Sequence, residues 1–582
     1  MDKEQELRIL HGNVVLKQGD VTMKCDSAYF YVAQNQVKAF GKVLIEQGDS
    51  VTIKAERLFY DGNTKNAQLE RKVFLTDKKA EITADSLDYS LLTKKALLRK
   101  NVLLKDSSST AKSEKLIYYV KNKQAELYKN VHLHDEKEQT DIFAQEVFYN
   151  LRSGKAELNK SVKLVQEESE IITETMHYNT KTAEGSYENG GQLTNKDQTL
   201  TSKRATFLSK QHKAVFQENV HLKTKDYDLR TPQLDYDTRS KKADFSGKSV
   251  ITSKDGTINA NKGSYDSEND RLELAERTTI ANKGQIIESD RFWNDKKKGY
   301  SHAEGSVILT DTAENRILYA DIARIYDKDK RMEAFGNALL QQVIDKDTLF
   351  LAADTIVSSK PAKSNTENKN VIDNKNIGTN NNRDDSKSGQ KDEQLNNIKA
   401  YHHVRILKPD LQGVCDSLAY MQQDSTFRMY GKPVIWHKDY QLSADTILVE
   451  TAHEKPYRIF LNSKALIGNQ VQAGVYNQIG GKRITGFFEN GDMQKMLADG
   501  SAESIYYAQD DDNSFTGVNR SFSGKMWLFF DDDELSRINF MNMPTATFYP
   551  MQDIKTKDFV LKGFEWKHKL RPQTLADLKK KL

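Results

Sequence analysis

The sequence has few cysteines, few prolines and no long apolar runs. Only 2 of its 582 residues are cysteine and 8 are proline. Two cysteines cannot form a disulfide framework, and Cys25 and Cys415 both occupy the small position of a repeating pattern, so we expect buried free thiols. No run of 18 apolar residues occurs, so the sequence predicts no membrane-spanning helix.

Motifs that would indicate catalysis are also missing. The sequence contains no glycine-rich phosphate loop, nucleophile elbow, paired zinc cysteines or HExxH motif. His132 and His134 alternate on a predicted strand, and acidic clusters occur at residues 510–512 and 531–533. Neither set includes the further ligands that a metal centre needs, so we predict ordinary histidines and solvated turn acids. We expect no catalytic residue, no metal and no cofactor.

Charge of either sign is not concentrated anywhere in the chain. The net charge is +4 and the two signs are interspersed, so we expect no nucleic-acid partner. Hydrophobic residues make up 37% and charged residues 29%, which favours a thin core with much solvated surface. The 25 tyrosines and 24 phenylalanines favour β-strands.

One pattern returns sixteen times along the chain, as in residues 53–60, IKAERLFY. If the small residue Ala55 is position zero, an aliphatic residue lies two before it, an apolar residue three after it and an aromatic residue five after it. Most steps between copies are 29 residues. A fixed period of this size indicates a repeat architecture. Position zero is occupied by Cys25, Ala55, Ala84, Ser113, Ala144, Thr173, Ser202, Thr231, Ala260, Ser289, Ala320, Ala353, Cys415, Ala444, Ala473 and Ala502.

The spacing inside each copy predicts strands that bend. Positions minus two and zero share one parity, and positions plus three and plus five share the other. Both pairs can face inward if the chain bends or bulges between them. We therefore predict an all-β, elongated, twisted antiparallel jelly-roll, in which each copy supplies about four short strands, two to each of two facing sheets. The acidic residue that recurs at plus one is expected to have a structural role at the bend.

The pattern also predicts how the chain is divided. Residues 1–357 form the repeat array, and residues 398–507 continue it. Residues 358–397 are rich in Asn, Lys and Asp and are predicted to be a disordered insertion. The step of 62 from Ala353 to Cys415 predicts one missing marker and a long insertion in a turn, with the stack continuous. Residues 508–582 depart from the pattern and are predicted to cap the array.

The repeats resemble those of the OstA-like family. The resemblance is carried by the segments ITADSLDY, LSADTILV and MKCDSAYF, and by the following segments KAFGKVLI, AELYKNVHL and MEAFGNALL. It covers roughly residues 9–507, and the opening of the chain is similar to long members from Bacteroidota-type bacteria. The family implies a β-jelly-roll whose groove carries lipopolysaccharide acyl chains between the two membranes, without a cofactor or catalysis.

The resemblance also implies partners and a location. Lipopolysaccharide, an inner-membrane export complex and an outer-membrane translocon are the expected partners, and open sheet edges favour end-to-end association. The chain begins without an apolar leader, which fits either a cytosolic protein or a mature protein whose leader has been removed. The resemblance implies the second, a periplasmic protein. The predicted lipid-groove residues are the inward positions Ile53, Leu58, Tyr60, Ile82, Leu87, Tyr89, Leu116, Tyr118, Ile142, Val147, Tyr149, Ile171, Met176 and Tyr178.

Two other functions stay open at this point. A filled solenoid could be a structural scaffold that presents its outer face to protein partners. An enzyme acting on envelope glycans would need a polar catalytic pair in one layer, and the sequence contains no such pair. The two remaining readings differ in one physical respect, namely whether the interior is open or filled.

Overall fold

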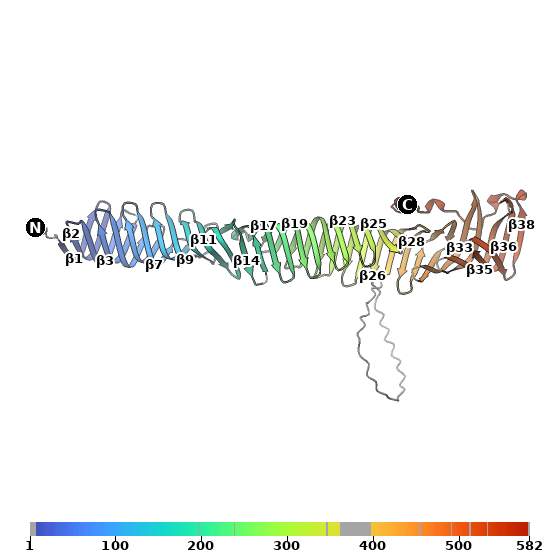
Figure 1. Ribbon diagram of the computed structural model, residues 1–582, viewed down its shortest axis with the longest axis horizontal. Coiled ribbons are helices and arrows are strands. Elements are labelled where there is room, and N and C mark those ends of the chain that lie inside the picture. The colour runs from blue at the N-terminus through green and yellow to red at the C-terminus, as the bar shows by residue number, and fades with distance from the viewer. Residues whose placement is uncertain are drawn as a thin grey trace, which may run out of the picture. The chain divides into compact units, whose positions relative to one another are not determined.

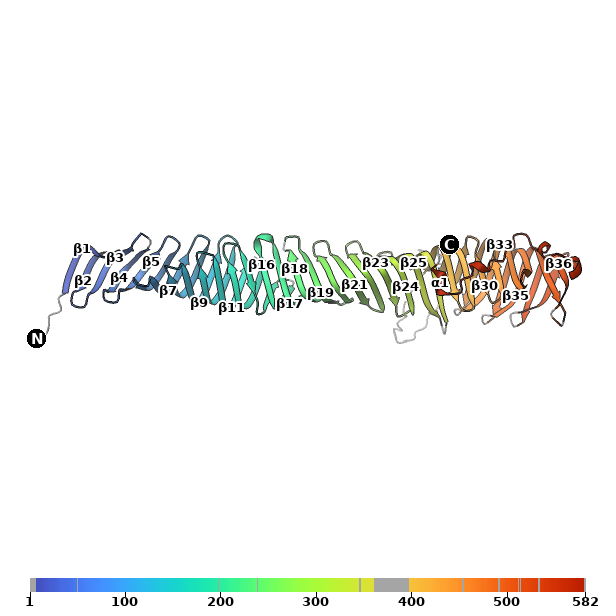
Figure 2. The ribbon, with the colours of Figure 1, turned by 90° about the horizontal axis from the view of Figure 1, so that it is seen from above.

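The computed structural model describes residues 7–49, 51–196, 198–237, 239–344, 347–360, 397–452, 455–489, 492–510, 512, 514–531 and 534–579. The chain forms two compact units, which are described separately: unit 1, Met1–Ala275, and unit 2, Glu276–Leu582. Both consist of antiparallel strands lying side by side (Figures 1 and 2), so the predicted all-β fold is confirmed. Within the described part of the chain, no helix is long and apolar enough to cross a membrane.

The described residues of unit 1 form twenty strands and one short 3-10 helix, and β21 (Arg271–Asn282) spans the division between the units. The elements are β1 (Leu7–Gln18), β2 (Val21–Tyr31), β3 (Gln36–Gln47), β4 (Val51–Asp61), β5 (Asn66–Thr76), β6 (Glu81–Ser90), β7 (Lys95–Lys105), β8 (Ser109–Tyr119), β9 (Gln124–Asp135), β10 (Thr140–Asn150), β11 (Lys155–Gln166), β12 (Ser169–Asn179), β13 (Glu184–Tyr187), β14 (Gly191–Asn195), β15 (Gln198–Ser202), β16 (Arg204–Leu208), η1 (Ser209–Gln211), β17 (Lys213–Thr224), β18 (Tyr227–Asp237), β19 (Lys242–Ser253) and β20 (Gly256–Asp266).

Unit 2 continues the same kind of strand and ends in short helical turns. Its elements are β22 (Gln285–Asp295), β23 (Tyr300–Asp311), β24 (Arg316–Tyr326), β25 (Arg331–Ile344), β26 (Asp347–Ser359), β27 (Asn397–Lys408), β28 (Leu411–Met421), β29 (Thr426–Tyr430), β30 (Val434–His437), β31 (Tyr440–Ser443), β32 (Thr446–Ala452), β33 (Lys455–Gln472), β34 (Val475–Glu489), β35 (Asp492–Gln509), β36 (Phe515–Asp531), β37 (Glu534–Met541), β38 (Thr545–Pro550), η2 (Met551–Asp553), η3 (Thr556–Asp558), η4 (His568–Leu570) and α1 (Leu575–Leu578).

Each regular copy in unit 1 forms two long strands, not the four short strands that the sequence predicts. In the pair β4 and β5, the register shifts between Lys54 and Arg57, so a bulge bends both strands without ending either. On β5 the bend is made by Arg71 and Lys72, whose φ angles are 64° and 50°. The prediction of four strands was wrong because the ladder of hydrogen bonds resumes on the far side of each bulge.

Two consecutive left-handed residues recur at this bend on the returning strands. On β7 they are Lys100 and Asn101, with φ angles of 64° and 50°. The carboxylate at plus one of the neighbouring strand lies against them, and Asn101 Nδ2 donates to Asp85 Oδ2 at 2.9 Å. This bond is on the outer surface of the bend. The recurring acidic residue therefore has the structural role that the sequence predicts.

The bends fold the sheet of unit 1 so that one of its faces becomes an interior. In β6, the side chains of Ile82, Ala84, Leu87 and Tyr89 are all buried, while their neighbours in sequence are exposed or half-buried. Both parities thus face inward, one before the bulge and one after it. The interior is one side chain deep from each wall, as the composition indicates.

Two predictions from the spacing do not hold in unit 2. Ala473, predicted to be an inward position, is exposed in the turn between β33 and β34. The described residues show no gap of one copy between Ala353 and Cys415, because β26 pairs directly with β27 and β27 with β28. Almost all of the predicted disordered insertion, residues 361–396, lies outside the described residues. The four predicted domain boundaries stay predictions.

The chain of unit 2 ends in a strap, residues 559–571, that lies on an outer face of its own strands. The side-chain amide of Gln478 makes two hydrogen bonds to the main chain of the strap. Its Nε2 donates to the Phe559 carbonyl at 3.1 Å, and its Oε1 accepts from the Leu561 amide at 2.9 Å. Gln441 makes a matching pair of bonds, of 2.8 and 2.7 Å, further along the strap. The strap is therefore held by side-chain amides of β34 and β31, which lie on either side of β33 in the sheet.

Candidate functional site

The fourteen predicted groove residues all lie on β4, β6, β8, β10 and β12 of unit 1. Thirteen of them are at most 5% exposed, and Tyr60 is half-buried. The structure therefore brings them together as one interior column. From Ile82 to Tyr178 their packing is tight, so in this state that part of the column is filled by protein side chains, whereas Leu58 and Tyr60 line a cavity. Whether it ever holds lipid stays a prediction.

The tyrosines of this column donate hydrogen bonds across the opening of the folded sheet. Each hydroxyl reaches a residue 41 to 43 positions earlier in the chain. We call these five contacts the rim bolts: Tyr60 to Gln18 at 2.7 Å, Tyr89 to Gln47 at 2.8 Å, Tyr118 to Asp77 at 2.5 Å, Tyr149 to Asp106 at 2.5 Å and Tyr178 to Asp135 at 2.9 Å.

The rim bolts join opposite ends of the strands. The tyrosines lie at the ends of β4, β6, β8, β10 and β12, which form the tyrosine rim, and the acceptors lie at or just after the ends of β1, β3, β5, β7 and β9, which form the acceptor rim. At about 3.3 Å per residue, an 11-residue strand such as β8 spans about 35 Å. Hydrogen bonds between opposite ends require the sheet to be folded onto itself. This part of unit 1 is consequently closed.

Each acceptor aspartate divides its two oxygens between two tasks. Asp77 Oδ1 accepts from the backbone amides of Lys79 and Ala80, at 3.1 and 3.0 Å, and so fixes its own turn. Its Oδ2 accepts from the Tyr118 hydroxyl and from Lys123 Nζ. The Asp77 side chain is fully buried, and these donors and the lysine charge compensate for its desolvation.

Burial keeps the tyrosine hydroxyls protonated. It raises the pKa of Tyr149 to about 12, and the neighbouring Asp106 carboxylate adds to the shift. Burial is also the main cause that raises the pKa of Tyr89, Tyr118 and Tyr178 above the ordinary tyrosine value. A protonated hydroxyl is the donor that each acceptor needs, so the rim bolts are intact at neutral pH.

A cavity of about 310 Å³ lies at the N-terminal end of this closed stretch. Its apolar lining comes from β1 to β4 and from Leu91, just after β6. It includes Phe30, which has no hydroxyl at the position that the tyrosines occupy in later copies. Gln18 and Tyr60, which form the first rim bolt, also line it. The cavity therefore reaches the first rim bolt, and Leu91 in its lining lies beside the second.

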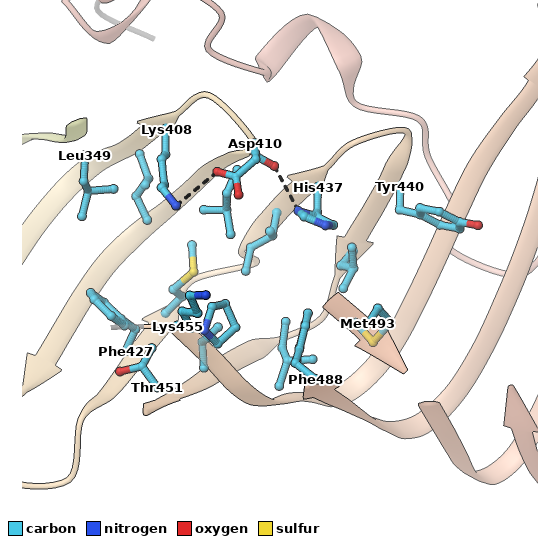
Figure 3. A pocket seen from close by; sticks show the side chains of 18 of the residues that line it. Leu349, Lys408, Asp410, Phe427, His437, Tyr440, Thr451, Lys455, Phe488 and Met493 are labelled. Atoms are coloured by element: carbon cyan, nitrogen blue, oxygen red, sulfur yellow. Dashed lines mark hydrogen bonds and ion pairs between the residues drawn. The ribbon is translucent and has the colours of Figure 1, made fainter. Parts of the chain in front are cut away.

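Unit 2 contains a larger apolar cavity, of about 370 Å³, between β25 and β36 (Figure 3). Its walls include Phe427, Met429, Phe488, Met493 and Met496. Methionine adapts to different neighbours because its side chain is flexible and polarisable. Such a lining suits a flexible apolar ligand better than a rigid one. A further cavity of about 320 Å³ in unit 2 is lined by residues of β22 to β27.

Charged groups surround the mouth of the larger cavity. Lys408 lies 3.5 Å from Asp410, and Nδ1 of His437 lies 3.0 Å from the Asp410 carbonyl (Figure 3). Lys455 lies on the other side of the opening, on β33. An apolar interior with a charged mouth matches an amphipathic ligand, because each part of the ligand meets a surface of its own polarity.

Sequence reasoning did not find this cavity. The signal was present at position plus five, where Val449 stands in the cavity wall in place of the tyrosines of unit 1. Valine has neither the ring that fills the interior nor the hydroxyl that closes the rim. The change from tyrosine to valine therefore leaves space between the walls.

His132 and His134 do not approach a metal-ligand set. Both contact the same carboxylate oxygen of Asp141, at 2.6 and 2.9 Å, on the outer face of unit 1. Hydrogen bonding to these two histidines holds the pKa of Asp141 below its usual value. Over the described ranges, no group of three or more potential metal ligands is found.

Comparisons with known proteins agree with the repeat pattern. A family model described as OstA-like protein matches residues 1–142 and 95–232, and one described as lipopolysaccharide-assembly, LptC-related, matches residues 186–283. No curated protein matches the sequence. One similar solved structure is LptH from Pseudomonas aeruginosa, the LptA-homologous periplasmic component of a lipopolysaccharide transport device. It is 12% identical, with a TM-score of 0.14, over 28% of this chain and 98% of that chain.

The family matches fall mainly on unit 1, where the repeats are most regular. They overlap the residues that carry the pattern seen in the sequence, including the five tyrosines of the rim bolts. Residues 1–232 are therefore similar to the OstA-like family, and residues 186–283 to the LptC-related lipopolysaccharide-assembly family.

Proposed function

We propose that this chain is a non-enzymatic bridge that carries the acyl chains of lipopolysaccharide along its apolar interior, across the periplasm between the inner and outer membranes. The observation that carries this proposal is the cavity of unit 2, which is apolar inside, charged at its mouth and lined by flexible side chains. The family match supports the choice of lipopolysaccharide as the lipid.

A repeating interior suits transport because successive layers offer similar contacts. Each methylene group of an acyl chain gains about 0.8 kcal/mol from apolar burial, so a chain that moves by one layer exchanges equal contacts. No layer is then a deep trap. The fourteen inward residues from Ile53 to Tyr178 would form the path in unit 1 when that unit is open.

The partners follow from the same proposal. An inner-membrane export complex would load the bridge and an outer-membrane translocon would receive the lipid. The strand β1 pairs with β2 on one side, and within the described residues no partner strand lies on its other side. This free edge favours end-to-end association with another jelly-roll.

A scaffold is the second candidate, and the tight packing of unit 1 favours it. Side chains such as Leu98 and Leu116 have no exposed surface, as in an ordinary filled core. A scaffold would keep this core filled at all times. A bridge would open it.

Photo-crosslinking in cells separates the two candidates. Phe488 lines the cavity of unit 2, whereas its neighbour Phe487 lies on the outer face, where its ring is 6.0 Å from that of Trp527. A benzophenone amino acid at either position replaces phenylalanine with a related aromatic. We expect a lipopolysaccharide adduct from position 488 and none from position 487. Protein adducts alone, or equal lipid labelling at both positions, would favour the scaffold.

A further inference from the structure

The rim bolts recur with one geometry over five consecutive copies of unit 1. In every case a buried or half-buried tyrosine donates to a glutamine or aspartate of the acceptor rim. Core packing alone would not need hydroxyls, because phenylalanine fills the same volume, as Phe30 does in the first copy. The hydroxyls serve the contact between the rims.

Other groups reinforce the contact from both sides. Gln47 Nε2 donates to the Leu91 carbonyl at 3.2 Å, which is a second bond between the rims at the level of Tyr89. Lys123 of the tyrosine rim pairs with Asp77 of the acceptor rim, and Lys123 is only 16% exposed. The side chains of Leu91, Val120 and Leu151, next to the tyrosines, are buried too.

The interior behind these contacts is lined by fully buried side chains. Ile82, Leu87, Leu98 and Leu104 are at most 1% exposed. By contrast, the N-terminal cavity is open up to Gln18 and Tyr60. An apolar chain can thus occupy that cavity beside the first bolt, but it cannot go further unless the rims separate.

We propose that the rim bolts are a gate, and that an acyl chain waits in the N-terminal cavity until the bolts open in sequence and admit it to residues 82–178. This proposal rests on the proposed transport function and adds its regulation. Opening does not require strands to unpair, since the walls can turn about the bulges where residues such as Arg71 and Lys72 already depart from strand geometry. The ladder within each wall stays intact.

Thiol labelling measures opening without any lipid. The two native cysteines, Cys25 and Cys415, are free and buried, and are first replaced with alanine. Leu87→Cys then reports access to the interior through its rate of reaction with a maleimide. Tyr89→Phe with Tyr118→Phe removes two bolts but keeps both rings. We expect the labelling rate to rise about tenfold or more, because buried hydrogen bonds to polar and charged acceptors are lost.

The control is Tyr119→Phe. Tyr119 neighbours Tyr118, but its ring lies outside, with Lys95 Nζ 5.3 Å from its centre. This variant should label at the parent rate. Gln47→Leu removes the acceptor of Tyr89 instead of the donor, and should raise the rate as Tyr89→Phe does. If circular dichroism shows that one tyrosine variant is poorly folded, Gln47→Leu still tests the gate. Unchanged labelling in folded Tyr89→Phe, Tyr118→Phe and Gln47→Leu proteins would overturn the gate.

The two proposals can fail separately. A lipopolysaccharide adduct at position 488 together with unchanged thiol labelling would retain transport and overturn the gate. Faster labelling without any adduct at position 488 would retain the opening of the rims and overturn transport, and with it the role of the gate in admitting lipid. In the variant that lacks two rim bolts, we expect both maleimide labelling and lipid adducts at position 87 to increase.

Discussion

Unit 1 between Ile82 and Tyr178 and unit 2 around its large cavity are built from the same strand pattern, yet one is closed and the other open. In unit 1, position plus five holds a tyrosine that fills the interior and closes the rim. In the cavity of unit 2 that position holds Val449. At this position a tyrosine accompanies the packed layers of unit 1, and a valine lies in the wall of the cavity of unit 2. The walls themselves need not change.

We expect the two regions to differ most in the unfolding free energy that is lost when a side chain is truncated to alanine. Leu98→Ala in unit 1, where Leu98 has no exposed surface, should lower the free energy of unfolding by about 3 kcal/mol, because a cavity replaces tight packing. Leu411→Ala in the wall of the existing cavity should cost only about 1 kcal/mol, because less packing is lost.

Urea unfolding can follow the two regions separately. All 4 tryptophans lie in unit 2, so their fluorescence reports that unit, and far-UV circular dichroism reports both. Equal losses of unfolding free energy in Leu98→Ala and Leu411→Ala would show that the two regions are packed alike. That result would contradict the contrast between a closed and an open region.

We expect a smaller loss of stability at high pH, and we expect this loss in unit 1. Tyrosine in the unfolded chain ionises near its ordinary pKa of 10, whereas Tyr149 in the folded protein keeps its proton up to about 12. Its contribution is thus fully present below pH 10 and is lost as the pH rises from 10 to 12. At pH 11 the loss from Tyr149 is about 1.4 kcal/mol.

Denaturation at pH 9 and pH 11, followed by circular dichroism, measures this loss. Tyr149→Phe should lose less stability than the parent over the same interval, by about 1.4 kcal/mol. If the stability of the two proteins depends on pH in the same way, Tyr149 is not protected from ionisation. Unit 1 would then not be closed at this position.

The smallest expected change in stability comes from giving unit 2 the residue of unit 1. Val449→Tyr should alter the free energy of unfolding by less than about 1 kcal/mol, because the ring enters existing space instead of a packed core. The same variant should lose the lipid adduct at position 488, since the space is occupied. Val449→Leu is the matched control and should keep the adduct. A loss of stability above about 2 kcal/mol in Val449→Tyr would show that the space is not available.

Much of the fold could be predicted from spacing alone. The parity change between Ile53 and Tyr60 indicates a bend, and both residues do face the interior. The number of strands could not be predicted, because nothing in the pattern tells whether hydrogen bonding resumes beyond the bend. That depends on two consecutive left-handed residues, such as Lys100 and Asn101, whose conformation only the paired strands fix.

The candidate site was predicted in part. The sequence identified the inward residues of unit 1, but not that they are packed shut. The closing contact joins residues from different copies, such as Tyr118 and Asp77, so it is invisible in a pattern defined within one copy. The column of tyrosines and the aspartates that precede the turns were the available signals. The cavity of unit 2 was missed because its signal in the sequence is the absence of a tyrosine at position plus five.

The spacing of the rim bolts has a consequence for how such a chain can change its length in evolution. Each of these five tyrosines finds its acceptor 41 to 43 residues back, beyond its own copy of about 29, so donor and acceptor belong to copies that are two apart in the chain. Duplicating or deleting one whole copy leaves this relation unbroken. Each such event lengthens or shortens the stack by two strand spacings, about 10 Å. Changes in copy number alone can therefore set the length of such a stack of strands.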